Sequence, residues 1–183
     1  NLVIHGGSDH NACDQTAQEA ESFGIQTHIT IGDLSKRSEV KRISEEALDV
    51  FGRVDVLIHN AAIRPHHNFF EIPDEEWDQV LEVNLGAAFQ FCRLLVPGML
   101  EQKWGRIITF AGINAIRGYP NSPHVSVSKH GSWGLVKALS RDFADQGITA
   151  NTISPGAILT ERSSIREEEF INKQAAEVPS KRL

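Results

Sequence analysis

The stretch GRVDVLIHNAAI, residues 52–63, decides the fold. Gly52 ends a helix that the helical spacing of apolar residues predicts over residues 40–51. A compact, largely apolar strand follows over residues 54–58, and two small alanines come soon after it. Such a strand, apolar on both faces, is typical of a parallel sheet that helices cover on both sides.

Strand-like and helix-like segments alternate along the rest of the chain, with no internal repeat. Further strands are expected over residues 2–4, 25–31, 107–111 and 148–153. Helices are expected over residues 9–23, 40–51, 74–96, 124–145 and 159–175. The alternation predicts one α/β domain over residues 1–183, with a parallel sheet and right-handed crossovers. Ligands of such sheets bind at the carboxyl ends of the strands.

Composition excludes several classes of partner. The 183 residues are 40% hydrophobic and 23% charged, as in an ordinary globular domain. The net charge of −6 and the lack of a basic patch make nucleic acid an unexpected partner. No apolar run reaches the ~18 residues of a membrane span, and the N-terminus lacks the basic residues of a signal peptide.

The cysteines and histidines are not spaced as metal ligands. Cys13 and Cys92 lie far apart in the sequence, which favours reduced thiols in a cytoplasmic protein. His66 and His67 are adjacent, and neighbouring residues rarely bind one ion together. No metal site is expected, and these two histidines are interpreted as loop residues near the mouth of a substrate site.

Five segments resemble, in order, motifs of the short-chain dehydrogenase/reductase family, in particular its 3-oxoacyl-[acyl-carrier-protein] reductase-like members. They are GRVDVLIHNAAI (52–63), DEEWDQVLEVNL (74–85), GRIITFAG (105–112), HVSVSKHG (124–131) and ITANTISPGAILTE (148–161). The resemblance implies a Rossmann-like, doubly wound parallel sheet. It also implies an oxidoreductase that uses NAD or NADP on a small-molecule carbonyl or alcohol.

The resemblance also implies roles for individual residues. Asn84 and Lys129 match two catalytic residues of the family, and Lys129 would also hold the ribose hydroxyls of the cofactor. The other positions that match cofactor-binding residues are Ser8, Asp33, Leu34, Asn60, Ala61, Ala62, Pro155, Gly156, Ile158 and Thr160. Asp33 is equally a turn residue before a helix. His59, where the family has asparagine, is interpreted as bracing the sheet.

Two catalytic positions of the family are substituted. Val125 stands one helical turn before Lys129, where the family has its tyrosine, and Gly112 stands at the serine position. Neither side chain can donate a proton, and a positioned general acid contributes about 10²–10⁴ in rate. On sequence alone, restoring both hydroxyls is expected to raise activity by that factor.

Three neighbours are alternatives for the missing hydroxyls. His124 precedes Val125 and titrates near neutrality, although adjacent helical positions point about 100° apart. Tyr119 lies in the preceding loop, and Asn114 lies two residues after Gly112. Each is also explained as a local turn or helix-start residue, so the identity of a substitute stays open.

The segment around Gly6, Gly7 and Ser8 resembles the end of the family's second strand, because the next strand leads to Asp33 and then to residues 52–63. The first strand with its pyrophosphate loop, and the last strand, are therefore not expected here. In the family's numbering the predicted strand order is 3-2-(1)-4-5-6, with position 1 empty. Strands 2 to 6 are then residues 2–4, 25–31, 54–58, 107–111 and 148–153. Residues 5–8 at the end of strand 2 include no acid and no arginine, and His5 and Ser8 favour NADP slightly over NAD.

Apolar residues on more than one face of two helices suggest self-association. In the helices over 74–96 and 124–145 these are Leu81, Phe89, Leu95, Val127, Leu135 and Leu139. The resemblance implies a homodimer or homotetramer through these helices.

Because of the two substitutions at positions 112 and 125, a catalytically inactive binding or regulatory protein remains the alternative to an enzyme. A bare interaction scaffold is a third hypothesis.

Overall fold

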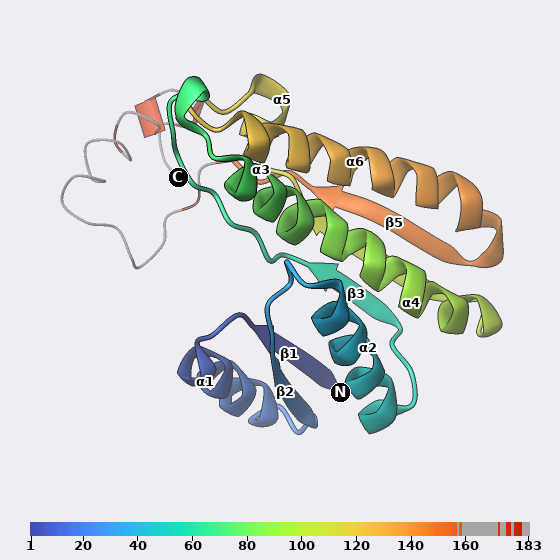
Figure 1. The fold of residues 1–183 in the computed structure, drawn as a ribbon. Coiled ribbons are helices and arrows are strands. Elements are labelled where there is room, and N and C mark those ends of the chain that lie inside the picture. Colours follow the sequence, from blue (N-terminus) through green and yellow to red (C-terminus); the bar gives the residue numbers. More distant parts are fainter. Residues whose placement is uncertain (157, 159–171, 173–174, 177, 181–183) are drawn as a thin grey trace.

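Five parallel strands form the framework of the protein. A computed structural model describes residues 1–156, 158, 172, 175–176 and 178–180, apart from the side chains of residues 113 and 114. The strands are β1 (Leu2–Gly6), β2 (Thr27–Ile31), β3 (Val56–His59), β4 (Gly105–Phe110) and β5 (Ile148–Ile153). The predicted α/β class with parallel strands is confirmed (Figure 1).

The strands form two separate ladders. One has the order β1-β2 and the other has the order β3-β4-β5, all pairs being parallel. Within the described residues no strand joins β1 to β3, so each of these two strands keeps one unpaired backbone edge. The predicted pairing of residues 54–58 with residues 107–111 is found between β3 and β4, and the arrangement agrees with an empty first position.

Helices pack on these strands from both sides. Helix α1 (His10–Glu21) contacts β1 and β2, while α2 (Arg37–Phe51) packs on β2 and beside α4 (Ala87–Glu101). Helix α6 (Pro123–Phe143) covers β4 and β5 (Figure 1). Gly52 ends α2 in the left-handed region, with φ 74°, as its position in the sequence predicted.

One long helical segment differs from its prediction. Helix α3 (Asp74–Leu81), a π-helical turn (Glu82–Gly86) and α4 follow one another without a break. The predicted end near residue 96 was therefore wrong. Pro97 lies inside α4, on an exposed part of it, and the helix continues to Glu101 because the following turn remains packed around the buried Met99.

The joined helix Asp74–Glu101 is long and apolar enough to cross a membrane by length and composition. The sequence contains no uninterrupted apolar run of that length, because Asn84, Gln90 and Arg93 lie between the apolar residues of this helix. Half of the most apolar window is buried inside the protein, as in a core helix. Its buried side chains include Phe91, Leu95 and Met99, which belong to the main hydrophobic core.

Three short elements were not predicted, and one predicted helix lies outside the described residues. The short elements are α5 (Ile113–Arg117) and two 3₁₀ turns, Phe69–Glu71 and Ala144–Gln146. They have too few residues for a hydrophobic period to indicate them. The helix expected over residues 159–175 falls almost wholly outside the described residues.

Candidate active site

Asn84 lies in the π-helical turn and joins two parts of the site. Its Oδ1 accepts a hydrogen bond from the backbone N–H of Ile63 at 2.9 Å, and its Nδ2 donates to the carbonyl of Ile63 at 3.0 Å. The side chain is 1% exposed. Asn84 therefore fixes the segment that follows β3, where a ligand of a parallel sheet would lie.

Two serines connect Asn84 to α6. Nδ2 of Asn84 also donates to Oγ of Ser128 at 3.0 Å, and Oγ of Ser132 donates to the backbone carbonyl of Asn84 at 3.0 Å. Both serines are fully buried. π-Turns are frequent at functional sites, and here Ser132 satisfies the carbonyl of the residue at the turn's centre.

Lys129 presents a buried ammonium group at the carboxyl end of β4. Its Nζ donates to the carbonyl of Phe110 at 2.7 Å, and the residue is only 7% exposed. Burial, followed by the positive charge of Arg64, lowers the pKa of Lys129 to about 8. An ammonium has three donors, so Lys129 has hydrogen-bonding capacity beyond Phe110.

The two substituted positions are shaped for the residues they hold. Gly112 has φ +88°, a backbone conformation that residues other than glycine rarely adopt. Val125 is fully buried, so a tyrosine ring there needs volume that the packed interior lacks. Restoring both family residues therefore conflicts with the backbone at one site and with packing at the other. This geometry therefore argues against the gain in activity that the sequence alone predicted for restoring serine at 112 and tyrosine at 125.

Tyr119 brings a hydroxyl to the place where the family has serine. A Cβ built on Gly112 would have the phenol oxygen of Tyr119 at 3.5 Å. The backbone N–H of Tyr119 donates to Oγ of Ser126 at 2.7 Å, and its carbonyl accepts from the N–H of Ser122 at 3.2 Å. Tyr119 is half-buried and is thus held against the start of α6 while its phenol faces Gly112.

His124 faces α3. Its ring has no exposed surface, stacks on Trp77, and places Nε2 3.2 Å from Oε1 of Glu76. The other carboxylate oxygen of Glu76 lies 3.0 Å from Nε2 of His67. Among the described residues Nδ1 of His124 has no partner. This buried position fits a structural link between the loop after β3 and α6 better than contact with a substrate.

His59 is also buried, at the end of β3. Burial, and then the charge of Lys129, lowers its pKa to about 4, while the backbone carbonyls of Val83 and Asn84 act in the opposite direction. Nε2 has no hydrogen-bond partner in the described part of the chain. The imidazole is therefore neutral at physiological pH, and it lies beside the helical turn that holds Asn84.

Small residues follow β3, as predicted. Ala61 and Ala62 are half-buried, and Asn60 is exposed beside them. After β5, Pro155 is half-buried, and Gly156 and Ile158 are exposed, Ile158 at 67%. The position of Thr160 lies outside the described residues. The carboxyl ends of β3, β4 and β5 thus offer a buried cation beside backbone that small side chains leave accessible.

The ends of β1 and β2 hold the remaining predicted positions. Ser8 is exposed just after β1, whereas the ring of His5 already contacts the carbonyl of Gly32, with Nε2 at 3.0 Å. Asp33 is exposed, and its Oδ1 accepts from both the N–H and the hydroxyl of Ser35, which lowers its pKa. Leu34 is buried in the core. Asp33 thus stabilises its own turn, one of its two predicted roles.

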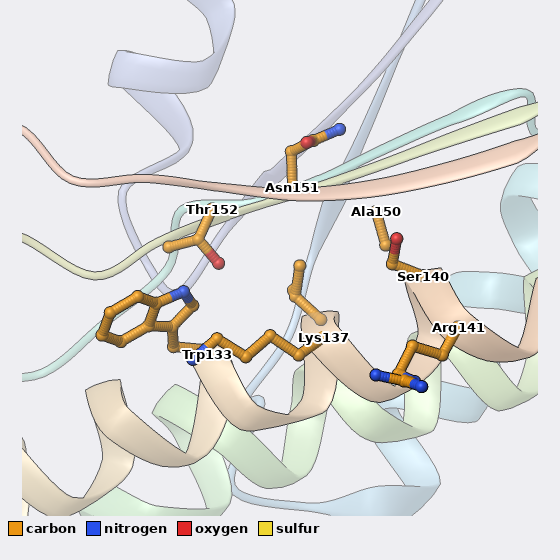
Figure 2. A pocket seen from close by; sticks show the side chains of 8 residues that line it. Trp133, Lys137, Ser140, Arg141, Ala150, Asn151 and Thr152 are labelled. Atoms are coloured by element: carbon orange, nitrogen blue, oxygen red, sulfur yellow. The ribbon is translucent and has the colours of Figure 1, made fainter. Parts of the chain in front are cut away.

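One cavity lies away from these strand ends. It measures about 480 Å³ and is lined by Trp133, Val136, Lys137, Ser140, Arg141, Ala150, Asn151 and Thr152 (Figure 2). It lies between the outer face of α6 and β5. A hollow of about 220 Å³, lined by His66, His67, Asn68, Glu71 and Asn121, is nearer to the candidate site. In the described part of the chain no three His, Cys, Asp or Glu residues could hold a metal ion.

Sequence reasoning missed two features of the site. It gave Glu76 no role, although this carboxylate contacts two histidines from different segments. It also named Tyr119 only as one of three alternatives, without placing its phenol beside Gly112. The only available signal was that Tyr119 is the single tyrosine of the chain and lies within the segment that joins Gly112 to α6.

Comparisons with known proteins agree with this geometry. The family model of the short chain dehydrogenases matches residues 1–169. A 3-oxoacyl-[acyl-carrier-protein] reductase FabG of Staphylococcus epidermidis is 28% identical over the whole chain, which spans 75% of that relative. A D-beta-hydroxybutyrate dehydrogenase of Cupriavidus necator is 33% identical over 87% of this chain and 62% of its own.

A solved structure is similar throughout. It is a putative NAD(P) dependent gluconate 5-dehydrogenase from Beutenbergia cavernae with bound NADP at low occupancy. The TM-score is 0.88 at 29% identity, covering 100% of this chain and 73% of the other. Together with the match over residues 1–169, this similarity shows that the chain belongs to the short chain dehydrogenase family.

Proposed function

We propose that this chain is an oxidoreductase that transfers hydride between NAD(P)(H) and a carbonyl or alcohol group of a small molecule. The observation that supports this most directly is the buried ammonium of Lys129 at the end of β4. Maintaining a positive charge at 7% exposure is costly, and such groups cluster at functional sites.

The residues present fit the nicotinamide end of the cofactor. Lys129 would donate to the ribose hydroxyls, and Asn60, Ala61 and Ala62 would lie beneath the cofactor. Asn84 would keep the adjoining segment in position through Ile63. When bound, the cofactor would supply or accept the hydride. Pro155, Gly156, Ile158 and Thr160 would surround the nicotinamide. Asp33 would contact the adenine, and Leu34, whose side chain is in the core, would contact it through its backbone.

A preference for NADP over NAD is the finer proposal. Ser8 is exposed two residues after β1, and residues 5–8 include no acid that would repel a 2′-phosphate. The neighbouring Asp9 accepts from the N–H of Ala12 at the start of α1. His5 contributes less than the sequence suggested, because its ring contacts Gly32 and burial lowers its pKa. Ser8→Asp should therefore shift the preference toward NAD, and Ser22→Asp, an exposed serine elsewhere, should not.

Cofactor binding and turnover form the test. Quenching of the three tryptophans by NADPH and NADH measures binding. Acetoacetyl-CoA is the first substrate to assay, because an acetoacetyl-CoA reductase of Cupriavidus necator is 30% identical over this chain. We expect NADPH to bind and to be oxidised slowly. Absence of both binding and turnover across a broad panel of ketones and alcohols would contradict the proposal.

A second candidate is a catalytically inactive binding or regulatory protein. Gly112 and Val125 motivate it, because neither supplies the hydroxyl of the family's active site. Under this alternative NADPH quenches tryptophan fluorescence and no carbonyl compound oxidises it. The two measurements together distinguish the candidates.

We also propose that the protein is a cytoplasmic homo-oligomer, dimeric or tetrameric, that associates through α4 and α6. Phe89 and Val127 are 46% and 47% exposed on these helices. Leu95, in contrast, belongs to the core and is unavailable. The two cysteines are free thiols, as expected in a reducing compartment. A monomer by light scattering at micromolar concentration would contradict the assembly.

A further inference from the structure

Tyr119 is the only tyrosine in the chain, and its phenol lies at the site where the family's hydroxyl is missing. We propose that Tyr119 is a catalytic residue whose phenol contacts the substrate oxygen and gives it the proton in carbonyl reduction. This inference rests on the proposed oxidoreductase function and assigns its proton donor to a residue outside the family pattern.

The first observation is the distance to Gly112. The phenol oxygen is 3.5 Å from a Cβ built at Gly112, so it would be in van der Waals contact with a side chain at that position. The phenol of Tyr119 therefore lies beside Gly112, two residues after the carboxyl end of β4. A tyrosine brings the same chemical group, an O–H donor, from the loop rather than from the strand end.

The second observation is that the backbone of Tyr119 is fixed. Its N–H donates to Oγ of Ser126 at 2.7 Å, and its carbonyl accepts from Ser122 at 3.2 Å. Both partners lie at the start of α6, the helix that positions Lys129 one turn further on. The phenol and the ammonium are therefore held by the same helix, although their residues are ten positions apart in the sequence.

The third observation concerns the alternatives. The ring of His124 has no exposed surface and faces Glu76, and Val125 is fully buried. Tyr119 is half-buried, which keeps its hydroxyl within reach of a small molecule. Among the described residues near Gly112, it combines a donor hydroxyl with access to solvent.

The proton balance is simple. As the carbonyl carbon takes the hydride and the reduced nicotinamide is oxidised, the O–H bond of Tyr119 breaks and the O–H bond of the product alcohol forms. The resulting phenolate takes a proton from water.

Two measurements test the role. Tyr119→Phe keeps the ring and removes only the hydroxyl, so NADPH should still quench tryptophan fluorescence while kcat with acetoacetyl-CoA falls about 10²- to 10⁴-fold. A Phe variant that turns over as fast as the unchanged protein overturns the inference and leaves the proposed function intact. If the unchanged protein reduces nothing across the panel, the proposed function and the role of Tyr119 both fail.

A spectroscopic readout does not depend on turnover. With fluorotyrosine incorporated biosynthetically, the single tyrosine gives one ¹⁹F resonance. Acetoacetyl-CoA added with NADP⁺, which cannot reduce it, should shift this resonance if the phenol touches the ligand. An unshifted resonance at saturating ligand overturns the contact. Ser126→Ala should lower kcat by a smaller factor through loss of positioning, and Ser126→Thr should restore it.

Discussion

Asn84 holds Ile63 by both of its backbone hydrogen-bonding groups, with Oδ1 accepting from the N–H at 2.9 Å and Nδ2 donating to the carbonyl at 3.0 Å. Asn84→Ala leaves both groups without their partner in a half-buried segment. We expect a loss of about 2–4 kcal/mol in the free energy of unfolding, measured by urea titration. Asn151→Ala, an exposed asparagine on β5, should cost far less, and equal costs for the two would contradict this account.

Lys129 should make the free energy of unfolding depend on pH in the alkaline range. Its pKa is lowered from 10.5 to about 8 in the folded protein, so between these values the unfolded chain binds more protons. The free energy of unfolding attributable to Lys129 therefore rises with pH across this window. Cys92 acts in the opposite direction above 9.0, because burial raises its pKa to about 12.

The difference between the unchanged protein and Lys129→Met isolates the contribution of Lys129, since Cys92 is common to both. We expect the pH-dependent rise to be absent from the Met variant in urea titrations at a series of pH values. Parallel curves for the two proteins would show that the ammonium is not buried as described.

His59 should make the protein acid-sensitive. Burial lowers its pKa from 6.5 to about 4, so as pH falls through this interval the unfolded chain takes up a proton that the folded protein does not. Stability is then lost progressively, by up to about 3 kcal/mol. His59→Asn should unfold with a weaker pH dependence between these two values, as followed by circular dichroism. A variant as acid-sensitive as the parent would contradict the assignment.

Gly112 and Gly118 offer a matched pair of substitutions. Both have a positive φ, +88° and +85°, so alanine at either should cost about 1–3 kcal/mol of backbone strain. A Cβ at 118 would meet nothing within 4 Å, whereas one at 112 would contact the phenol of Tyr119. Gly112→Ala should therefore also shift the ¹⁹F resonance of Tyr119. Equal shifts in both variants would indicate a general disturbance of the loop.

The strands were predictable because β1, β3 and β4 contain short apolar runs, while β2 and β5 alternate apolar and polar residues that favour strands. The pairing of β3 with β4 and the choice of Asn84 and Lys129 as candidate site residues followed from a family resemblance rather than from local pattern. The π-turn around Asn84 could not be predicted, because Asn84 donates to Ser128 and accepts from Ser132 on α6, 44 and 48 residues away.

The contact between Tyr119 and Gly112 could not be predicted from the sequence either. The intervening α5 has five residues, too few for periodicity to set its direction, and only the anchoring of Tyr119 by Ser126 determines where the phenol points. For the same reason Glu76 gave no signal: its two histidine partners come from segments 9 and 48 residues away.

The left-handed backbone at Gly112 has a consequence for redesign of the site. A variant with serine there would have to change the path of the chain, and one with tyrosine at 125 would have to enlarge a filled interior. Each of these substitutions therefore lowers the free energy of unfolding by itself. Substitutions in the loop that ends at the half-buried Tyr119 disturb the fold less, so this loop is the better place to begin.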